Sequence, residues 1–220
     1  YLSYINICSR MSNYQLFQND LPSKVIKSFK GDISIDTETL GLNVKRDRLC
    51  LIQLRNETDK KNYLIKFEKD LSSKQSKNLK FLLENKSLTK IFHYSRFDMA
   101  VLKENLKISV KNVFCTKVAS KLTRTYSSKH GLKDLVDEIL NIQLDKTEQS
   151  SDWSKKKLTK KQINYAMNDV LYLSEIKKSL SEKLLGQNRL KLFNSVMKFM
   201  ETRVELDLKG WEGTDIFAHK

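Results

Sequence analysis

The feature that most constrains the fold is the division of the 220-residue chain into an early half rich in strands and a late half that is almost entirely helical. Short β-branched or alternating runs predict strands at 32–36, 48–55, 62–67, 90–94 and the start of 113–122. Helical spacing predicts helices at 77–85, 97–106, the rest of 113–122, 131–140, 159–184 and about 187–206. A mixed sheet with helices packed around it follows from this order, so the predicted fold class is an α/β layered domain.

Charge and cysteine content restrict the partners and the compartment. The formal net charge of +15 attracts polyanions, of which nucleic acid is the usual one, although lysine is so abundant throughout that a compositional bias would give the same charge. Cys50 and Cys115 lie in apolar runs without a CxxC pair, as buried thiols of a reducing compartment do, and a cytoplasmic location is expected. There is no apolar run of 18 residues and no secretory signal, so no membrane contact is expected.

Two acidic residues stand together at the end of the first predicted strand. Asp36 and Glu38 are two positions apart, so in extended chain their carboxylates project to the same side. Like charges so close together are unfavourable unless a cation neutralises them, and hard oxygen ligands suit Mg²⁺ or Mn²⁺. The pair alone is equally typical of solvated turn residues.

Two further segments supply matching groups. Asp98 lies in the first turn of a predicted helix, where the helix dipole alone would favour an acid. Tyr165 and Asp169 are four residues apart and share one helix face, which could also be the polar edge of an amphipathic helix. Together the four carboxylates can hold two divalent ions for in-line phosphoryl chemistry, and the tyrosine can orient a water. The sequence contains no phosphate-binding GxxxxGK[ST] loop that would indicate an ATPase.

These motifs resemble a known superfamily. DTETLGL, HYSRFD and YAMNDVLYL are similar to the three motifs of the DEDD exonucleases in their tyrosine-bearing branch, and the block from GLKDLVDEIL to SSDWSKKKLT resembles ribonuclease D. The resemblance covers about 14–185 and implies a ribonuclease H-like 3′–5′ exonuclease fold. Residues 1–13 are then expected to be an N-terminal extension, and 186–220 a C-terminal helix and tail that packs on the domain or on a neighbouring subunit.

RDRLCLIQL, FCTKVASKLTRTYSSKHGLK and the ending LDLKGWEGTDIFAHK further resemble the short bacterial nanoRNase C group. That resemblance implies hydrolysis of very short RNA, above all dinucleotides, at the end of RNA degradation, and a homo-oligomer that could be a ring-shaped octamer. Trp211 and Phe217 in the tail would then cover a neighbour's surface or fold back on their own domain. The alternatives are trimming of longer structured RNA such as tRNA precursors, a DNA exonuclease, and a nucleic-acid-binding domain without catalysis.

The resemblance also implies roles for individual residues. It implies that four acids hold two divalent ions, and these are Asp36, Glu38, Asp98 and Asp169. It also implies that Tyr165 positions the attacking water. Leu42 corresponds to an apolar residue that wedges against the bases, although it could equally be a core leucine. Thr37, His93 and Arg96 are expected to contact substrate, and Arg124 and Lys129 are further candidates for a phosphate, with core or solubilising roles as the alternatives.

Overall fold

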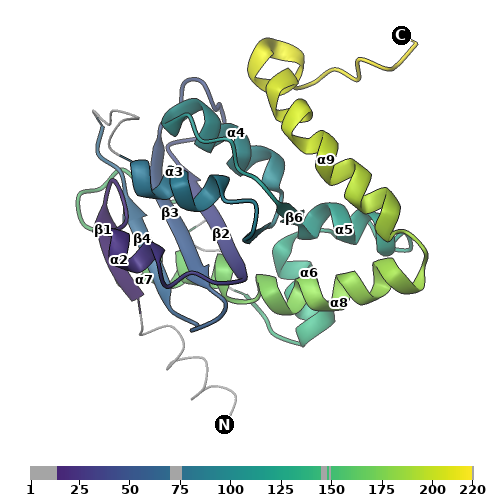
Figure 1. Cartoon of the computed structure of the whole chain (residues 1–220), viewed down its shortest axis with the longest axis horizontal. Coiled ribbons are helices and arrows are strands. Elements are labelled where there is room, and N and C mark those ends of the chain that lie inside the picture. The colour runs from purple at the N-terminus through teal and green to yellow at the C-terminus, as the bar shows by residue number, and fades with distance from the viewer. Residues whose placement is uncertain (1–13, 70–75, 145–147, 149, 220) are drawn as a thin grey trace.

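The computed structural model describes residues 14–69, 76–144, 148 and 150–219 (Figure 1). The predicted N-terminal extension, 1–13, lies outside the described residues. Among the helices of the described ranges, none combines the length and the apolar character needed to cross a membrane.

The described strands form one mixed sheet in the order β1-β4-β3-β2-β5-β6. Their bounds are β1 Tyr14–Gln18, β2 Asp32–Thr39, β3 Leu49–Asn56, β4 Asn62–Lys66, β5 Thr89–Phe92 and β6 Val113–Cys115. Strands β2, β3 and β4 pair antiparallel, whereas β1 runs parallel to β4, β5 to β2 and β6 to β5. The mixed sheet with surrounding helices confirms the predicted α/β class and the ribonuclease H-like exonuclease fold.

Two strand predictions need correction. Strand β2 was expected to end at Asp36, but it continues to Thr39, so Asp36 and Glu38 lie within the strand. The strand is longer than predicted because β3 pairs with β2 as far as Thr39. The apolar run that indicated the strand ends before this point. Strand β1 was not predicted from the sequence, because this five-residue edge strand has adjacent apolar residues, Phe17 and the exposed Leu16, and no clear alternation.

Helices cover both faces of the sheet (Figure 1). Their bounds are α2 Ser23–Ile26, α3 Lys77–Glu84, α4 Ser95–Leu106, α5 Thr116–Thr123, α6 Leu132–Leu140, α7 Lys160–Leu171, α8 Leu173–Gly186 and α9 Leu190–Leu206. The helix predicted over 159–184 is two helices, because Tyr172 leaves helical geometry at φ −110° and ψ 0°. Helix α4 packs on one face of the sheet, and α7 lies across β2 and β3 on the other. Cys50 and Cys115 are buried free thiols, as predicted.

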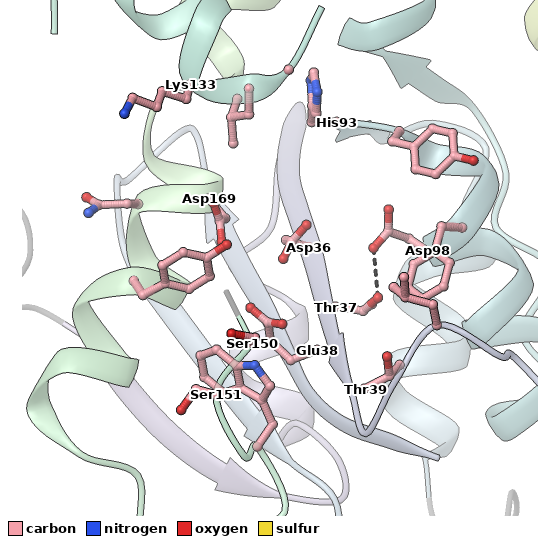
Figure 2. Close-up of a pocket in the computed structure, with 18 of the residues that line it drawn as sticks. Asp36, Thr37, Glu38, Thr39, His93, Asp98, Lys133, Ser150, Ser151 and Asp169 are labelled. Atoms are coloured by element: carbon pink, nitrogen blue, oxygen red, sulfur yellow. Dashed lines mark hydrogen bonds between the residues drawn. The ribbon is translucent and has the colours of Figure 1, made fainter. Parts of the chain in front are cut away.

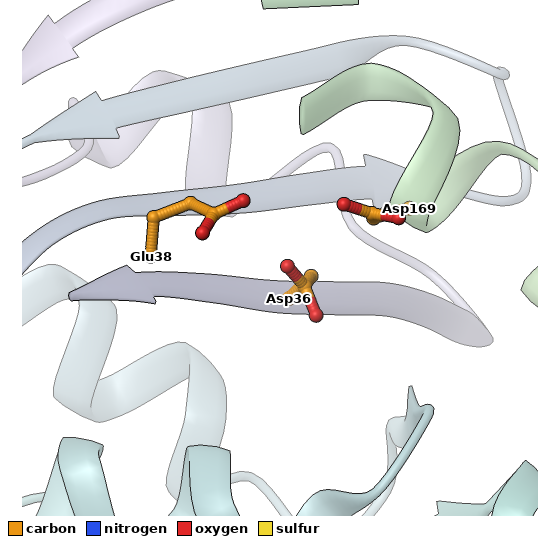
Figure 3. A group of neighbouring side chains, drawn as sticks. All are labelled: Asp36, Glu38 and Asp169. Carbon is orange, nitrogen blue, oxygen red and sulfur yellow. The ribbon is translucent and has the colours of Figure 1, made fainter. Parts of the chain in front are cut away.

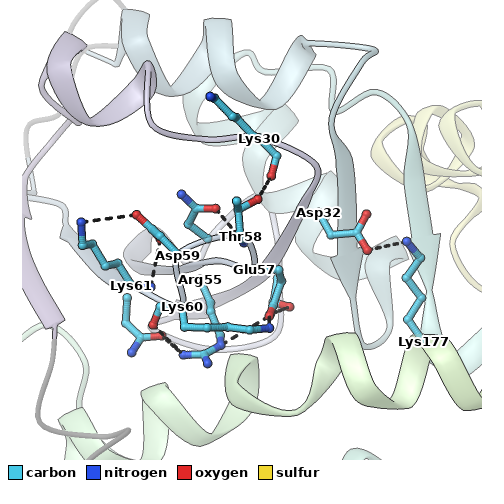
Figure 4. A network of polar contacts seen from close by, with 12 residues as sticks. Lys30, Asp32, Arg55, Glu57, Thr58, Asp59, Lys60, Lys61 and Lys177 are labelled. Atoms are coloured by element: carbon cyan, nitrogen blue, oxygen red, sulfur yellow. Dashed lines mark hydrogen bonds and ion pairs between the residues drawn. The ribbon is translucent and has the colours of Figure 1, made fainter.

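A polar network fixes the start of β2 relative to the β3–β4 turn (Figure 4). The Ser34 hydroxyl donates a 2.6 Å hydrogen bond to the Glu57 carboxylate, which also accepts one of 2.8 Å from the Lys60 ammonium. The Asp32 carboxylate pairs with the Lys177 ammonium of α8 at 2.5 Å. These contacts hold β2 on both sides just before the acidic residues that it carries.

The C-terminal segment packs back on the domain. Helix α9 lies against α4, and its Met200 and Val204 belong to the main hydrophobic core. The sequence predicted no regular structure after this helix, and the short turn that follows it, Asp207–Trp211, is kinked at Gly210, which adopts a left-handed φ of 104°. The end of the chain beyond this turn is exposed, Phe217 for instance by 77%.

Candidate active site

Three carboxylates meet between β2 and α7 (Figure 3). Asp36 and Glu38 alternate with Thr37 along β2 and therefore point to the same face of the sheet, where α7 presents Asp169. One carboxylate oxygen from each of the three lies within 4.8 Å of those of the other two. Segments more than 100 residues apart thus bring their acids together as the sequence motifs indicated.

The fourth acid, Asp98, approaches from α4 (Figure 2). Asp98 is only 3% exposed, and its carboxylate accepts a 2.7 Å hydrogen bond from the Thr37 hydroxyl. Thr37 stands next to Asp36 on β2, but its side chain points toward Asp98. Tyr94 adopts a left-handed φ of 71° between β5 and α4, and this sharp turn places Asp98 in the first turn of the helix. Asp98 lies outside the tight group of three but close enough to influence it electrostatically.

Burial and mutual repulsion make this cluster unfavourable by itself. Burial, and then the charges of Asp98, Asp169 and Glu38, raise the pKa of Asp36 well above its usual range. The pKa of Glu38 is raised for the same reasons, although a hydrogen bond from the Gln53 amide opposes the increase. Divalent cations bound by oxygen ligands would relieve this repulsion, so the residues present fit Mg²⁺ or Mn²⁺.

We expect the cluster to make the stability of the metal-free protein depend on pH. Burial raises the pKa of Asp98 from 3.8 to about 7. Between pH 3.8 and about 7, Asp98 is protonated in the folded state but ionised in the unfolded state. Its contribution to the free energy of unfolding is therefore fully present below pH 3.8 and is lost as the pH rises through about 7. In EDTA, the melting temperature of the wild type should fall over this range more steeply than that of Asp98→Asn.

Excess Mg²⁺ or Mn²⁺ should raise the wild-type melting temperature most at neutral pH, because the ions bind ionised carboxylates. Thermal unfolding of both proteins from pH 4 to 8, with EDTA and with either ion, measures this. Parallel curves for the wild type and Asp98→Asn in EDTA would contradict the electrostatic account.

Tyr165 lies beside the cluster, one helical turn before Asp169. Burial, and then the charge of Asp169, raise the pKa of Tyr165 above its usual value, so the hydroxyl stays protonated at neutral pH. The Trp153 ring packs against it at a centroid distance of 6.0 Å. Lys66 donates a 3.2 Å hydrogen bond to the Trp153 carbonyl, and Gln162 donates one of 3.0 Å to the preceding carbonyl. The sequence did not indicate these contacts: Lys66 is a buried polar group in a strand, and Gln162 forms a capping box with Thr159, which indicates a helix start but not a contact with Trp153.

The acids open into a cavity of about 700 Å³. Leu42 lines it and is 85% exposed, which excludes the alternative that it is a core leucine. The loop that carries Leu42 is closed by Asp47, whose carboxylate accepts a hydrogen bond from the Asn43 backbone amide. A Cβ at Gly41 would lie only 2.4 Å from that carboxylate. A side chain at position 41 would therefore have to displace the Asp47 carboxylate that closes the loop.

Two lysines that the sequence did not single out, Lys117 and Lys133, also line the cavity. Figure 2 shows Lys133 above Asp169, on the far side of that residue from Glu38. In a chain with 41 lysines and arginines, no local pattern separates these two from the others. Their positive charges complement an anionic ligand in the cavity.

The other basic candidates divide into two groups. His93 lines the cavity, where its Nδ1 lies 2.9 Å from the Thr116 hydroxyl, and burial lowers its pKa to about 3, so it is neutral. Arg96 is not among the lining residues, because its guanidinium pairs with Asp207 at 2.5 Å. Arg124 is fully buried and pairs with the Glu138 carboxylate. Arg124 also donates a 2.7 Å hydrogen bond to the Lys129 carbonyl. Because Arg96 and Arg124 are held by these other partners, the structure does not bring either guanidinium to the acidic cluster.

Comparisons with known proteins agree with this geometry. A 3′–5′ exonuclease family model matches residues 14–185. Ribonuclease D of Desulfotalea psychrophila is 30% identical over 209 residues, which are 91% of this chain and 54% of that protein. The chain thus spans about half the length of the curated relatives that it matches.

Solved structures match over a greater share of their length. Brucella melitensis NrnC superposes with a TM-score of 0.89 at 44% identity, covering 95% of this chain and 100% of that one. The same protein has been solved bound to pGG, with a TM-score of 0.88 at 45% identity over 94% of this chain and 99% of that one. It has also been solved with Mg²⁺, with a TM-score of 0.87 at 43% identity over 94% and 100%. The chain therefore belongs to the 3′–5′ exonuclease family, as a ribonuclease-D-like member similar to NrnC in length and fold.

Proposed function

We propose that this protein is a 3′–5′ exoribonuclease that hydrolyses very short RNA, above all dinucleotides, to mononucleotides at the end of RNA degradation. The observation that carries the proposal is the carboxylate cluster beside Tyr165, which opens into a cavity of about 700 Å³. No nucleophilic side chain is needed, since water can be the attacking group.

Each residue of the cluster has a defined role in this proposal. Asp36, Glu38, Asp98 and Asp169 would hold two divalent ions, Mg²⁺ or Mn²⁺, as the burial and repulsion of these acids favour. When bound, such ions lower the pKa of a water and stabilise the leaving 3′-oxygen. The protonated hydroxyl of Tyr165 can orient the attacking water from its place beside Asp169.

The cavity supports a short substrate. Its volume of about 700 Å³ lies within the range of pockets that enclose small ligands, and Leu42 projects into it as a wedge against the bases would. Lys117 and Lys133 supply positive charge for the phosphates, and Thr37 and His93 also line the cavity as further substrate contacts. NrnC, the similar protein of Brucella, was solved with the dinucleotide pGG bound, which agrees with this size.

The second candidate is the trimming of longer RNA 3′ ends, which the 30% identity to ribonuclease D favours. A turnover series on 5′-labelled RNAs from two to about ten nucleotides separates the two. We expect the dinucleotide to be hydrolysed at least about ten-fold faster than the pentanucleotide, because a longer chain has to leave the cavity past its wall. Rates that are flat or rise with length would support ribonuclease-D-like trimming, and matched DNA oligomers in the same series test for a DNA exonuclease.

The exposed tail supports self-association. Phe217 is 77% exposed and Trp211 45%, and the Phe217 ring lies 6.2 Å from that of Phe199 on α9. Such an apolar surface is typical of a protein contact. We therefore propose a homo-oligomer, in the form of the ring-shaped octamer that the family resemblance implies. We also propose a cytoplasmic location, because that is where terminal RNA degradation would take place.

A further inference from the structure

We infer that Asp207 is a positioning residue that couples the C-terminal turn to two parts of the active site, the start of α4 with Asp98 and the loop that carries Leu42. The inference rests on the proposed function in that both parts serve the reaction proposed above. It assigns a role to the tail within its own subunit.

The first connection runs from the turn to α4. The Arg96 guanidinium donates hydrogen bonds of 2.5 and 2.8 Å to the two oxygens of the Asp207 carboxylate, and one of 2.6 Å to the Glu212 carbonyl. Arg96 is the second residue of α4 and stands two positions before Asp98. The two-pronged contact fixes the direction as well as the distance of the arginine, and so restrains the first turn of the helix.

A second arginine makes the same carboxylate a junction. Arg203 of α9 donates hydrogen bonds of 2.9 and 2.6 Å to Asp207 Oδ1. It also donates to the Trp211 carbonyl and, at 3.2 Å, to the Thr214 carbonyl. The Asp207 side chain is only 10% exposed, so both charge-assisted contacts are largely shielded from water. One carboxylate therefore holds α4, α9 and the turn together.

The turn also lies opposite the loop that carries Leu42. Residues of the loop and of the turn face each other across a small cavity of about 120 Å³, lined by Asn43, Val44, Lys45, Ala100, Asp207, Leu208, Gly210 and Glu212. Val44 and Leu208 both pack against the main hydrophobic core. Asp47 holds the loop from within through the Asn43 backbone amide, and the C-terminal turn faces the loop across the small cavity, so we expect a displaced turn to shift the loop that carries Leu42.

This arrangement explains why Arg96 lies away from the substrate cavity although it is next to a catalytic motif. Three of its five N–H groups, those on Nε and Nη2, donate to Asp207 and Glu212. The arginine therefore acts on the reaction through the position of α4 and of the loop. A misplacement of about 1 Å in a catalytic group can lower a rate by roughly a hundred-fold, so such a support has a measurable effect.

The test compares Asp207→Asn with Glu205→Gln in the full chain. Asparagine keeps the size of the side chain but loses the charge shared by the two arginines. Glu205 is the matched control, because it forms another contact between α9 and α4, to Lys103 at 2.5 Å, and meets the turn only through an exposed 3.7 Å ion pair with Lys209. We expect Asp207→Asn to lower kcat/KM for an RNA dinucleotide about ten-fold, with a lower kcat as well as a higher KM, and Glu205→Gln to change it less than two-fold.

Hydrogen exchange supplies a readout that does not depend on catalysis. In Asp207→Asn, the amides of 42–47 and 94–98 should exchange faster than in the wild type, while those of β3 and β4 stay unchanged. Unchanged exchange in both segments, or a kcat/KM equal to that of the wild type, would overturn the inference. If the wild type itself does not hydrolyse short RNA, the proposed function fails, and the exchange data alone decide whether Asp207 supports the loop and the helix.

Discussion

Replacing Asp36 with asparagine is expected to reduce kcat by about a thousand-fold or more while raising the melting temperature of the metal-free protein by a few degrees. The carboxylate lies at the centre of the cluster, where it would ligate a divalent ion and where its pKa is raised by burial and by three neighbouring acids. Asparagine removes the charge with little change in size, so repulsion falls while a ligand is lost. Turnover of an RNA dinucleotide and thermal unfolding in EDTA measure the two effects.

The opposite signs of these effects make the experiment specific. Metal-induced stabilisation should also be largely lost in Asp36→Asn, because fewer ionised carboxylates remain. Asp59→Asn, in the β3–β4 turn and paired with Lys61, is the matched control and should leave all three quantities unchanged. Undiminished hydrolysis by Asp36→Asn would exclude the metal-site assignment, and a lower melting temperature in EDTA would exclude the electrostatic account of the cluster.

Replacing Tyr165 with phenylalanine is expected to reduce kcat about a hundred-fold with little change in metal binding. The hydroxyl lies beside Asp169 and remains protonated, because burial and that carboxylate raise its pKa. Phenylalanine keeps the ring that packs on Trp153 but cannot orient a water. Single-turnover hydrolysis of a dinucleotide, together with the shift in melting temperature caused by Mn²⁺, separates chemistry from metal binding.

The corresponding control is Tyr126→Phe, which removes an exposed hydroxyl that donates to Glu138 outside the cavity. It should retain wild-type turnover. Because the Tyr165 hydroxyl does not ionise near neutral pH, the wild type should also show no alkaline loss of kcat from this group below about pH 10. Equal rates for Tyr165→Phe and the wild type would show that water is oriented by another group.

Local patterns in the sequence were sufficient for the parts of the site that depend on periodicity. Asp36 and Glu38 share a face because alternate residues of a strand do so, and Tyr165 and Asp169 share a face because a helix turns once in about four residues. These relations hold wherever the strand and the helix lie. They were therefore predicted correctly, although the strand extends to Thr39, beyond its predicted end.

Contacts between distant segments could not be predicted in the same way. Arg96 stands next to a catalytic motif in the sequence, yet its partner is Asp207, 111 residues further along the chain. The lysines of the cavity and the supports of Trp153 depend likewise on which segments the fold brings together. Backbone periodicity decides which face a side chain occupies, and this information is local. The choice of partner depends on packing of the whole chain, so only the tertiary structure decided whether a charged side chain faces the cavity or supports its walls.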